Sequence, residues 1–139
     1  MAFVLDVSLA ASWFLPDEQS DAAERLIVQL ATSRGLVPAL FWFEMRNLFI
    51  MAQRRGRLAP GVALAAIQQL RALPLSDGGT VADSTIIDIA RRHGLSGYDA
   101  SYVALAKTSV MPLATLDQKM AAAARSEGIA IVGPLEHDE

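Results

Sequence analysis

The sequence predicts an α/β fold in which a parallel β-sheet is covered by helices on both faces. Two observations indicate it: short apolar stretches recur along the chain, and amphipathic stretches long enough for helices separate them. Strands joined by helices pair in parallel, and such sheets bury both faces under those helices. The 139 residues, of which 53% are apolar, match one domain with a substantial core, so we expect a single domain over 1–139.

The first half of the chain contains two of the expected strands. Residues 2–5 (AFVL) form an apolar run that ends at Asp6, and GLVPAL supplies a second strand. Ser20 and Asp21 suit the start of a helix, and Gly35 suits its end. The helices expected in this half cover residues 8–15, 19–33, 40–56 and 61–72.

The second half continues the alternation with three more strands, so the sheet should contain four to five. These strands are expected at residues 73–77, 111–115 and 129–133. A Gly-Leu-Ser-Gly break separates two helices, and Gly128 closes the last one. The helices expected in this half cover residues 80–93, 98–109 and 118–127.

Composition excludes several classes of protein. The chain has no cysteine, which rules out a disulfide framework and a thiolate metal site. Its first residues, MAFVLDVSLA, lack the basic and apolar regions of a secretion signal, and no stretch approaches the roughly 18 uninterrupted apolar residues of a membrane span. We therefore expect a soluble, cytoplasmic protein that does not associate with membranes.

A local basic patch is possible on this acidic chain. The net charge of -3 is not typical of a protein that binds nucleic acid through a general basic excess. Four of the 12 basic residues nevertheless lie close together in the sequence, namely Arg46, Arg54, Arg55 and Arg57. They are candidate contacts for backbone phosphates, and the alternative is a solvated helix end whose arginines are favoured by the helix dipole.

Three aspartates are expected to meet at one edge of the sheet. Asp6 ends the first strand, Asp117 follows the strand at 111–115, and Asp99 opens the helix at 98–109. In open α/β sheets this edge, at the carboxyl ends of the strands, is where ligands bind. Each aspartate also has a simpler interpretation: Asp6 and Asp117 as helix caps, and Asp99 as an acid favoured by the helix dipole.

Glu44 is a fourth candidate and lies inside a helix. Its neighbours at three, four and seven positions are mostly apolar, so its carboxylate should project from the buried stripe of that helix. A charge in such a place needs a partner. That partner is either an arginine in a buried ion pair or a cation shared with the other acids.

Taken together, the four acids predict a metal site. Two carboxylates about 4 Å apart repel by roughly 4 kcal/mol at an effective dielectric constant near 20, which exceeds the roughly 1 kcal/mol that a helix cap contributes. A cluster of them therefore needs a counter-charge or protonated members. His93 and His137 lie at a helix end and in the terminal tail, so we expect an all-oxygen site, which suits Mg²⁺ or Mn²⁺.

The stretches around these acids resemble the PIN-domain nucleases, and most closely the VapC toxins of bacterial toxin–antitoxin modules. The resemblance covers nearly the whole chain. Its most specific parts are YDASYVALA around Asp99 and TLDQK around Asp117, and it also includes DVS from Asp6 and the residues that follow Glu44.

The resemblance implies a three-layer α/β/α fold with a pocket of four carboxylates. The family's metal-binding acids fall on Asp6, Glu44, Asp99 and Asp117. The positions of its supporting hydroxyl and amide groups fall on Ser8, Thr115 and Asn47.

The resemblance also implies an activity and partners. The expected reaction is endonucleolytic hydrolysis of RNA with Mg²⁺ or Mn²⁺, and the expected inhibitor is a cognate VapB-type antitoxin. Family members commonly form homodimers, and the apolar residues Trp13 and Phe14 are candidates for the dimer surface.

Two alternatives remain open on the sequence alone. Another metal-dependent phosphohydrolase, of the phosphatase or receiver type, would also place an aspartate after its first strand. Such sites usually need paired acids there and a late lysine, whereas Asp6 stands alone and Lys107 and Lys119 are the only lysines. The other alternative is a non-catalytic PIN-fold module that binds protein through a vestigial pocket.

Overall fold

Five short strands form one parallel sheet in the computed structural model, which describes residues 2–137. In chain order the strands are β1 Phe3–Leu5, β2 Gly35–Val37, β3 Leu75–Asp77, β4 Leu113–Ala114 and β5 Ile131–Val132. Their order across the sheet is β3-β2-β1-β4-β5. All four strand pairs are parallel, as the alternation of strands and helices predicts.

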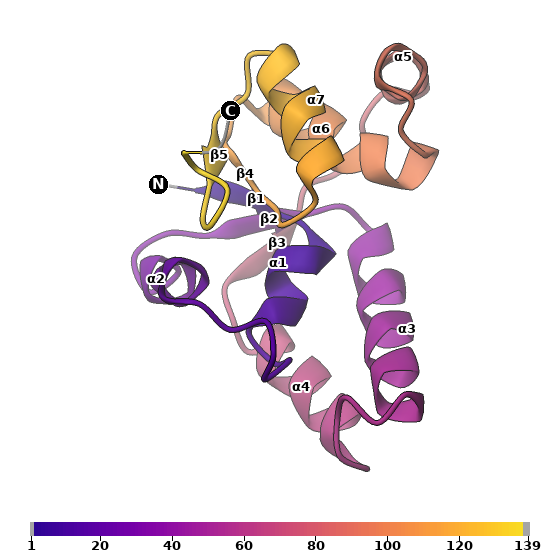
Figure 1. Cartoon of the computed structure of the whole chain (residues 1–139). Helices are drawn as coiled ribbons and strands as arrows, with labels where there is room; N and C mark the ends of the chain where they lie inside the picture. Colours follow the sequence, from indigo (N-terminus) through magenta and orange to yellow (C-terminus); the bar gives the residue numbers. More distant parts are fainter. Residues whose placement is uncertain (1, 138–139) are drawn as a thin grey trace.

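Helices cover both faces of the sheet, which confirms the three-layer α/β/α prediction. The helices α5, α6 and α7 lie on one side of the sheet, and α1 to α4 lie on the other (Figure 1). Their bounds are α1 Val7–Ser12, α2 Asp21–Gln29, α3 Leu40–Arg54, α4 Val62–Arg71, α5 Asp83–His93, α6 Gly97–Ser109 and α7 Gln118–Ser126.

The centre of the sheet is the most deeply buried part of the fold. All three residues of β1 are inaccessible to solvent, and so are Leu113 and Ala114 of β4. The strand order reverses direction here, because the chain builds β2 and β3 on one side of β1 and then crosses to β4 on the other side. Such a reversal leaves a crevice at the carboxyl ends of the two central strands, β1 and β4.

Of the two aromatic residues that were candidates for the dimer surface, Trp13 lies in the core. Trp13 is 6% exposed, and its indole N–H donates a hydrogen bond to the carbonyl of Ala23 at 2.8 Å. Phe14 is half-buried and packs edge-on against Phe49. The prediction that these residues form a dimer surface is therefore wrong for Trp13, whose helical apolar pattern serves the core.

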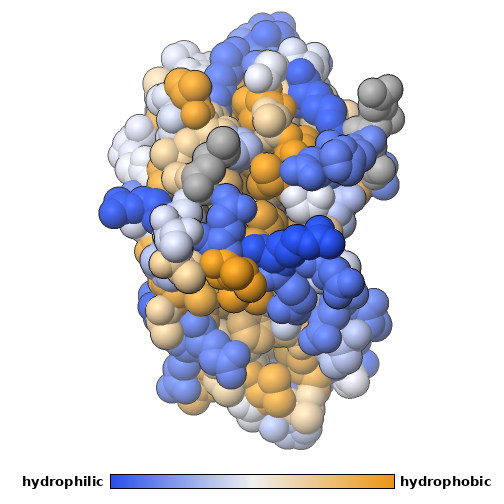
Figure 2. All heavy atoms as spheres, turned by 90° about the vertical axis from the view of Figure 1, so that its left-hand side faces the viewer, coloured by the Kyte–Doolittle hydropathy of each residue, from blue (hydrophilic) through white to orange (hydrophobic). Residues whose placement is uncertain are grey.

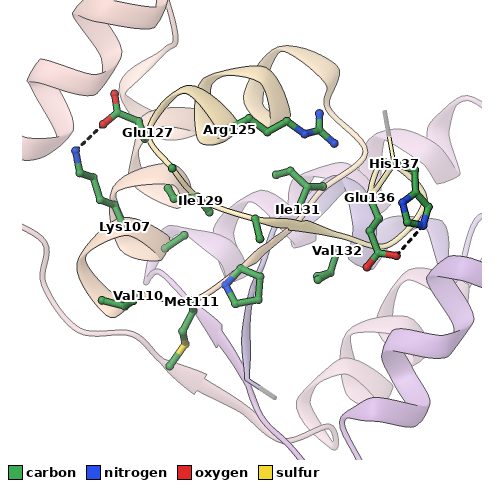
Figure 3. A pocket seen from close by; sticks show the side chains of 14 residues that line it. Lys107, Val110, Met111, Arg125, Glu127, Ile129, Ile131, Val132, Glu136 and His137 are labelled. Atoms are coloured by element: carbon green, nitrogen blue, oxygen red, sulfur yellow. Dashed lines mark hydrogen bonds and ion pairs between the residues drawn. The ribbon is translucent and has the colours of Figure 1, made fainter. Parts of the chain in front are cut away.

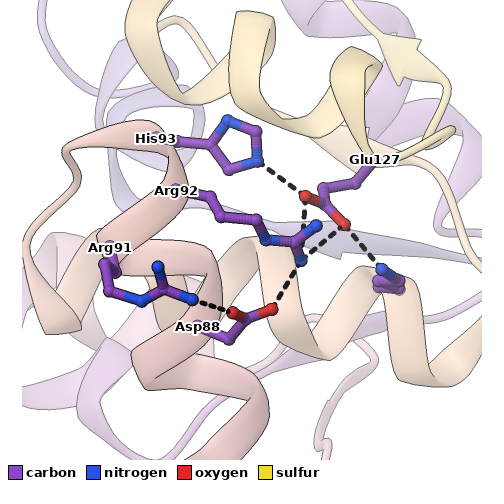
Figure 4. A network of polar contacts seen from close by, with 6 residues as sticks. Asp88, Arg91, Arg92, His93 and Glu127 are labelled. Atoms are coloured by element: carbon purple, nitrogen blue, oxygen red, sulfur yellow. Dashed lines mark hydrogen bonds and ion pairs between the residues drawn. The ribbon is translucent and has the colours of Figure 1, made fainter.

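A buried carboxylate joins the three helices on one side of the sheet (Figure 4). Glu127 follows α7, has a side chain only 4% exposed, and contacts His93 of α5 and Lys107 of α6 at 2.6 Å each. Arg92 reaches the same carboxylate at 3.2 Å. These partners, His93 before the others, lower the pKa of Glu127 to about 2.

The outer surface mixes polar and apolar groups. On the face seen from the side of α2 and β5, small apolar patches alternate with hydrophilic side chains (Figure 2). Within residues 2–137, no helix combines the length and the apolar character needed to cross a membrane.

Candidate active site

Asp6 directly follows β1, and its N–H donates to the carbonyl of Ala114 at the end of β4, at 3.0 Å. Its side chain is buried, with 2% of the residue exposed. One carboxylate oxygen, Oδ2, accepts hydrogen bonds from Ser8 Oγ at 2.5 Å and from Thr115 Oγ1 at 2.7 Å. Burial raises the pKa of Asp6 above its ordinary value, although both hydroxyl groups and, more weakly, the N–H groups of Val7 and Ser8 oppose this shift.

Ser8 and Thr115 join the two central strand ends into one polar network. Their hydroxyl oxygens lie 3.2 Å apart. Ser8 Oγ accepts the N–H of Leu116 at 2.9 Å, and Thr115 Oγ1 accepts the N–H of Asp117 at 3.0 Å. The hydroxyl groups therefore fix the position of the Asp6 carboxylate and of the loop that carries Asp117.

Asp117 caps a helix, as one of its two interpretations predicts, and it also lies near enough to Asp99 to repel it. Its carboxylate oxygen Oδ1 accepts the N–H of Met120 at 2.9 Å and so caps α7. Its charge also acts on Asp99 and contributes to the raised pKa of that residue. Asp6 differs, because it occupies the N-cap position of α1 without a capping hydrogen bond from its side chain.

Asp99 lies half-buried in the first turn of α6, as the sequence predicts. The cap of this helix is Ser96, whose hydroxyl accepts the N–H of Asp99 at 3.0 Å, so the Asp99 carboxylate is not needed for capping. Desolvation is the main cause of its raised pKa, followed by repulsion from Asp117. Lys119 partly offsets this shift, although its ammonium group is hydrogen-bonded to the carbonyl of Gly94 at 2.7 Å.

Glu44 is half-buried on α3, and its partner is a tyrosine. Tyr102 of α6 donates its hydroxyl to Glu44 Oε1 at 2.7 Å. The alternative of a buried ion pair between Glu44 and an arginine is not found among the described residues. Desolvation raises the pKa of Glu44, and repulsion by Asp6 and Asp99 raises it further.

The four acids come from four different parts of the fold, and repulsion links them in three pairs. Asp6 and Asp99 both act on Glu44, and Asp117 acts on Asp99. Across residues 2–137, no three acids or histidines are arranged closely enough to form a ready-made metal site. All four acids are oxygen donors, and none of them forms an ion pair within residues 2–137. Donors of this kind suit a hard divalent ion.

A hollow of about 400 Å³ lies along α3 beside Glu44. Glu44, Asn47, Arg55 and Arg57 line it, together with apolar side chains. Asn47 is exposed there, one turn after Glu44, where the sequence analysis placed it.

The four arginines of the predicted basic patch do not act as one group. Arg57 is held by two acids of the turn after α1, at 3.1 Å from Asp17 and 2.5 Å from Glu18. Arg46 lies over the ring of Phe43 at 4.7 Å, and Arg54 contacts the sulfur of Met51. Arg55 lines the hollow and makes no ion pair with any residue in 2–137.

A larger hollow, of about 900 Å³, lies elsewhere and contains none of the four acids. It runs beside β5 between the ends of α6 and α7, where Val110, Met111 and Ile129 line it (Figure 3). Of the charged groups that line it, Lys107 is paired with Glu127 and Glu136 with His137, while Arg125 donates to the carbonyl of Leu135. Among the four acids, Glu44 lines the smaller hollow and none lines this larger one, which is therefore not a candidate for the metal site.

The hydrogen bond from Tyr102 to Glu44 was not expected from the sequence. Tyr102 is three positions after Asp99 and thus on the same face of α6, which is the signal that the sequence offers. Its partner Glu44 is 58 positions away, and no local pattern joins the two.

Comparison with known proteins identifies the fold as that of PIN domains. The family model for the PIN domain matches residues 3–126, and the chain belongs to this family. Its relatives include two proteins named Ribonuclease VapC3. The one from Pyrobaculum aerophilum is 33% identical over 125 residues, which cover 87% of this chain and 93% of that protein. The one from Mycobacterium tuberculosis is 33% identical over 106 residues, 75% of each chain.

Two solved structures share the fold across nearly the whole chain. PAE2754 from Pyrobaculum aerophilum superposes with a TM-score of 0.66 at 24% identity and covers 95% of this chain and 92% of its own. FitAcB from Neisseria gonorrhoeae superposes with a TM-score of 0.64 at 17% identity, over 96% and 98%. The resemblance to PIN-domain proteins that the motifs suggest is thus confirmed by the family model, and the fold by both neighbours.

Proposed function

We propose that this protein is a divalent-metal-dependent endoribonuclease that hydrolyses RNA phosphodiester bonds. The observation that carries the proposal is the chain of repulsion that links Asp6 to Glu44, Glu44 to Asp99 and Asp99 to Asp117, and that helps to raise the pKa of Glu44 and of Asp99. The names of the two relatives support RNA as the substrate.

The acids would hold one or two Mg²⁺ or Mn²⁺ ions, with Asp6, Asp99 and Asp117 as direct ligands and Glu44 as a direct or water-mediated one. Such ions, when bound, lower the pKa of a coordinated water and stabilise charge on the attacking and leaving oxygens. Ser8 and Thr115 orient the Asp6 carboxylate through its Oδ2 atom. Arg55 and Asn47 lie along the adjoining hollow, where they would contact the RNA backbone.

The proposed biological role is that of a toxin in a VapBC toxin–antitoxin pair in the cytoplasm. The VapC names of the relatives support this role, and a VapB-type antitoxin would bind the protein and block the crevice. We also propose a homodimer. In the first half of the chain, the exposed apolar side chains available for its interface include Val28 and Phe43, which are 74% and 68% exposed, instead of the buried Trp13.

The test is cleavage of total cellular RNA by the purified protein with Mg²⁺, with Mn²⁺ or with excess chelator. Asp6→Asn and Asp99→Asn are the matched variants, because each removes one charge and keeps the shape of the side chain. Asp83→Asn, at the start of α5 and exposed, is the control for loss of an acid outside the crevice.

We expect discrete fragments that require the metal, that neither active-site variant produces, and that the control still produces. Intact RNA under every condition, from protein shown to be free of antitoxin, would contradict the proposal. It would favour a non-catalytic PIN-fold module, and turnover of small phosphate esters alone would favour another phosphohydrolase.

A further inference from the structure

Tyr102 combines complete burial with a hydroxyl that faces the acid crevice. The residue is 0% exposed and is among the largest fully buried side chains of the described structure. Its hydroxyl donates to Glu44 Oε1 at 2.7 Å, from α6 to α3. Burial, the hydrogen bond to Glu44 and the nearby acids all raise its pKa, so the hydroxyl keeps its proton and acts as a donor.

Glu44 needs such a donor to stay where it is. Asp6 and Asp99 repel it, and a glutamate on a helix has three side-chain torsions through which it can turn toward solvent. The tyrosine ring is fixed by the core, so its hydroxyl is a rigid anchor. The bond engages Oε1, and no hydrogen bond to Oε2 is found in the described part of the chain.

We infer that Tyr102 is a positioning residue that holds the Glu44 carboxylate at the crevice and leaves its second oxygen directed to a divalent cation. The inference rests on the proposed metal-dependent function and extends it to a residue outside the acid set. Hydrogen-bonded partners of metal ligands orient those ligands, and their loss typically weakens metal binding by about 10–100-fold.

The simpler interpretation is that Tyr102 only fills the core and finds a convenient acceptor. The two interpretations differ in what loss of the hydroxyl does. If Tyr102 only fills the core, the protein without this hydroxyl is less stable but binds the metal as tightly as before. If Tyr102 positions Glu44, the protein without the hydroxyl binds the metal more weakly, and it does so only while Glu44 is present.

The experiment is Mn²⁺ binding by calorimetry, with thermal unfolding of each variant as a check on the fold. The variants are Tyr102→Phe, Glu44→Gln and the double variant. Tyr98→Phe is the control, because it removes the same hydroxyl from an exposed tyrosine of the same helix. Glu44→Asp is a second probe, which draws the carboxylate back from the tyrosine and keeps its charge.

We expect Tyr102→Phe and Glu44→Asp each to weaken Mn²⁺ binding by about tenfold, and Tyr98→Phe to leave it unchanged. Adding Tyr102→Phe to Glu44→Gln should cause no further loss. Mn²⁺ affinity equal to wild type in Tyr102→Phe, with a clear loss in Glu44→Gln, would overturn the inference.

The same experiment separates this inference from the proposed function. Wild-type protein that binds Mn²⁺ but leaves RNA intact would contradict the nuclease activity alone, and the variants would still decide the role of Tyr102. Wild-type protein that binds no Mn²⁺ would overturn the positioning role together with metal dependence.

Discussion

Asp6 is a carboxylate almost without access to water. Two hydroxyl groups share one of its oxygens, yet burial still dominates and raises its pKa. Hydrogen bonds thus offset only part of the free energy lost on desolvation. A bound cation would offset the remaining cost of this buried charge and its repulsion with Glu44.

The hydroxyl of Thr115 should stabilise the fold through its hydrogen bond to Asp6. We expect Thr115→Val to lower the free energy of unfolding by about 1–3 kcal/mol at neutral pH, because a buried acceptor loses a donor. In an Asp6→Asn background the loss should be smaller. Urea unfolding measures both, and Thr108→Val, at an exposed position, is the control. Equal losses in the two backgrounds would show that Thr115 acts independently of Asp6.

Arg55 and Arg57 should differ in how strongly they contribute to RNA binding. Arg55 is unpaired within residues 2–137 and lines the hollow beside Glu44, whereas Arg57 is held by Asp17 and Glu18. In an inactive Asp99→Asn background, Arg55→Ala should weaken RNA binding and reduce the slope of log affinity against log salt by about 1. Arg57→Ala should have a smaller effect on both the RNA affinity and the salt slope. Fluorescence anisotropy at several salt concentrations measures this, and the reverse ranking would contradict the assignment.

At the scale of elements, apolar patterns predicted which segments form strands and helices but not where the first helices end. The helix expected at 8–15 is α1, which ends at Ser12, and the one expected at 19–33 ends at Gln29. The starts were more predictable, because a single cap marks them: Ser20 accepts the N–H of Ala23, as its position indicates.

The positions of Asp6 and Asp117 could be predicted for a related reason. A residue directly after a buried strand lies at the sheet edge wherever that strand pairs, so Asp6 and Asp117 could be placed from the sequence. The partners of Glu44 and Arg57 could not, because they depend on how α3 packs against α6 and on the turn after α1. Such contacts between distant segments leave no local pattern.

The junction of α5, α6 and α7 should be sensitive to pH through Glu127. Its pKa falls from 4.5 to about 2 on folding, so its contribution to stability is complete above pH 4.5 and disappears as the pH falls through 2. We expect Glu127→Gln to lower the free energy of unfolding by about 1–2 kcal/mol at pH 7, because the ion pairs with Arg92 and Lys107 are lost. The loss stays this small because solvent partly screens both cations.

Urea unfolding of Glu127→Gln and wild type between pH 7 and pH 2 measures this contribution. The two curves should converge as the pH approaches 2. Glu136→Gln, on a half-exposed side chain, is the control and should follow wild type throughout. A difference between Glu127→Gln and wild type that stays constant with pH would mean that packing, and not charge, joins these helices.

At the scale of the whole molecule, the strand order explains why the acids meet. The chain reverses its direction across the sheet between β3 and β4, which brings Asp6 and Thr115 side by side although they are 109 positions apart. The helices on the two faces then deliver Glu44 from α3 and Asp99 from α6. The parallel sheet could be predicted from the sequence, and the convergence follows from it.

Metal binding should therefore stabilise the whole fold. We expect Mg²⁺ or Mn²⁺ at about 100 times its dissociation constant to raise the melting temperature by about 5–10 °C. Asp99→Asn should melt higher than wild type without metal, because repulsion by Asp117 and desolvation of a charge are removed. Added metal should also raise the melting temperature of Asp99→Asn less than that of wild type. Differential scanning calorimetry with and without chelator measures both, and a metal response unchanged in Asp99→Asn would place the ion elsewhere.

Whether the four acids share a cation is decided by a crystal structure of the protein grown with Mn²⁺. We expect an anomalous difference peak between Asp6, Glu44, Asp99 and Asp117, with carboxylate oxygens moved in to contact it. A peak elsewhere on the molecule, or an empty crevice in crystals that contain Mn²⁺, would contradict this expectation.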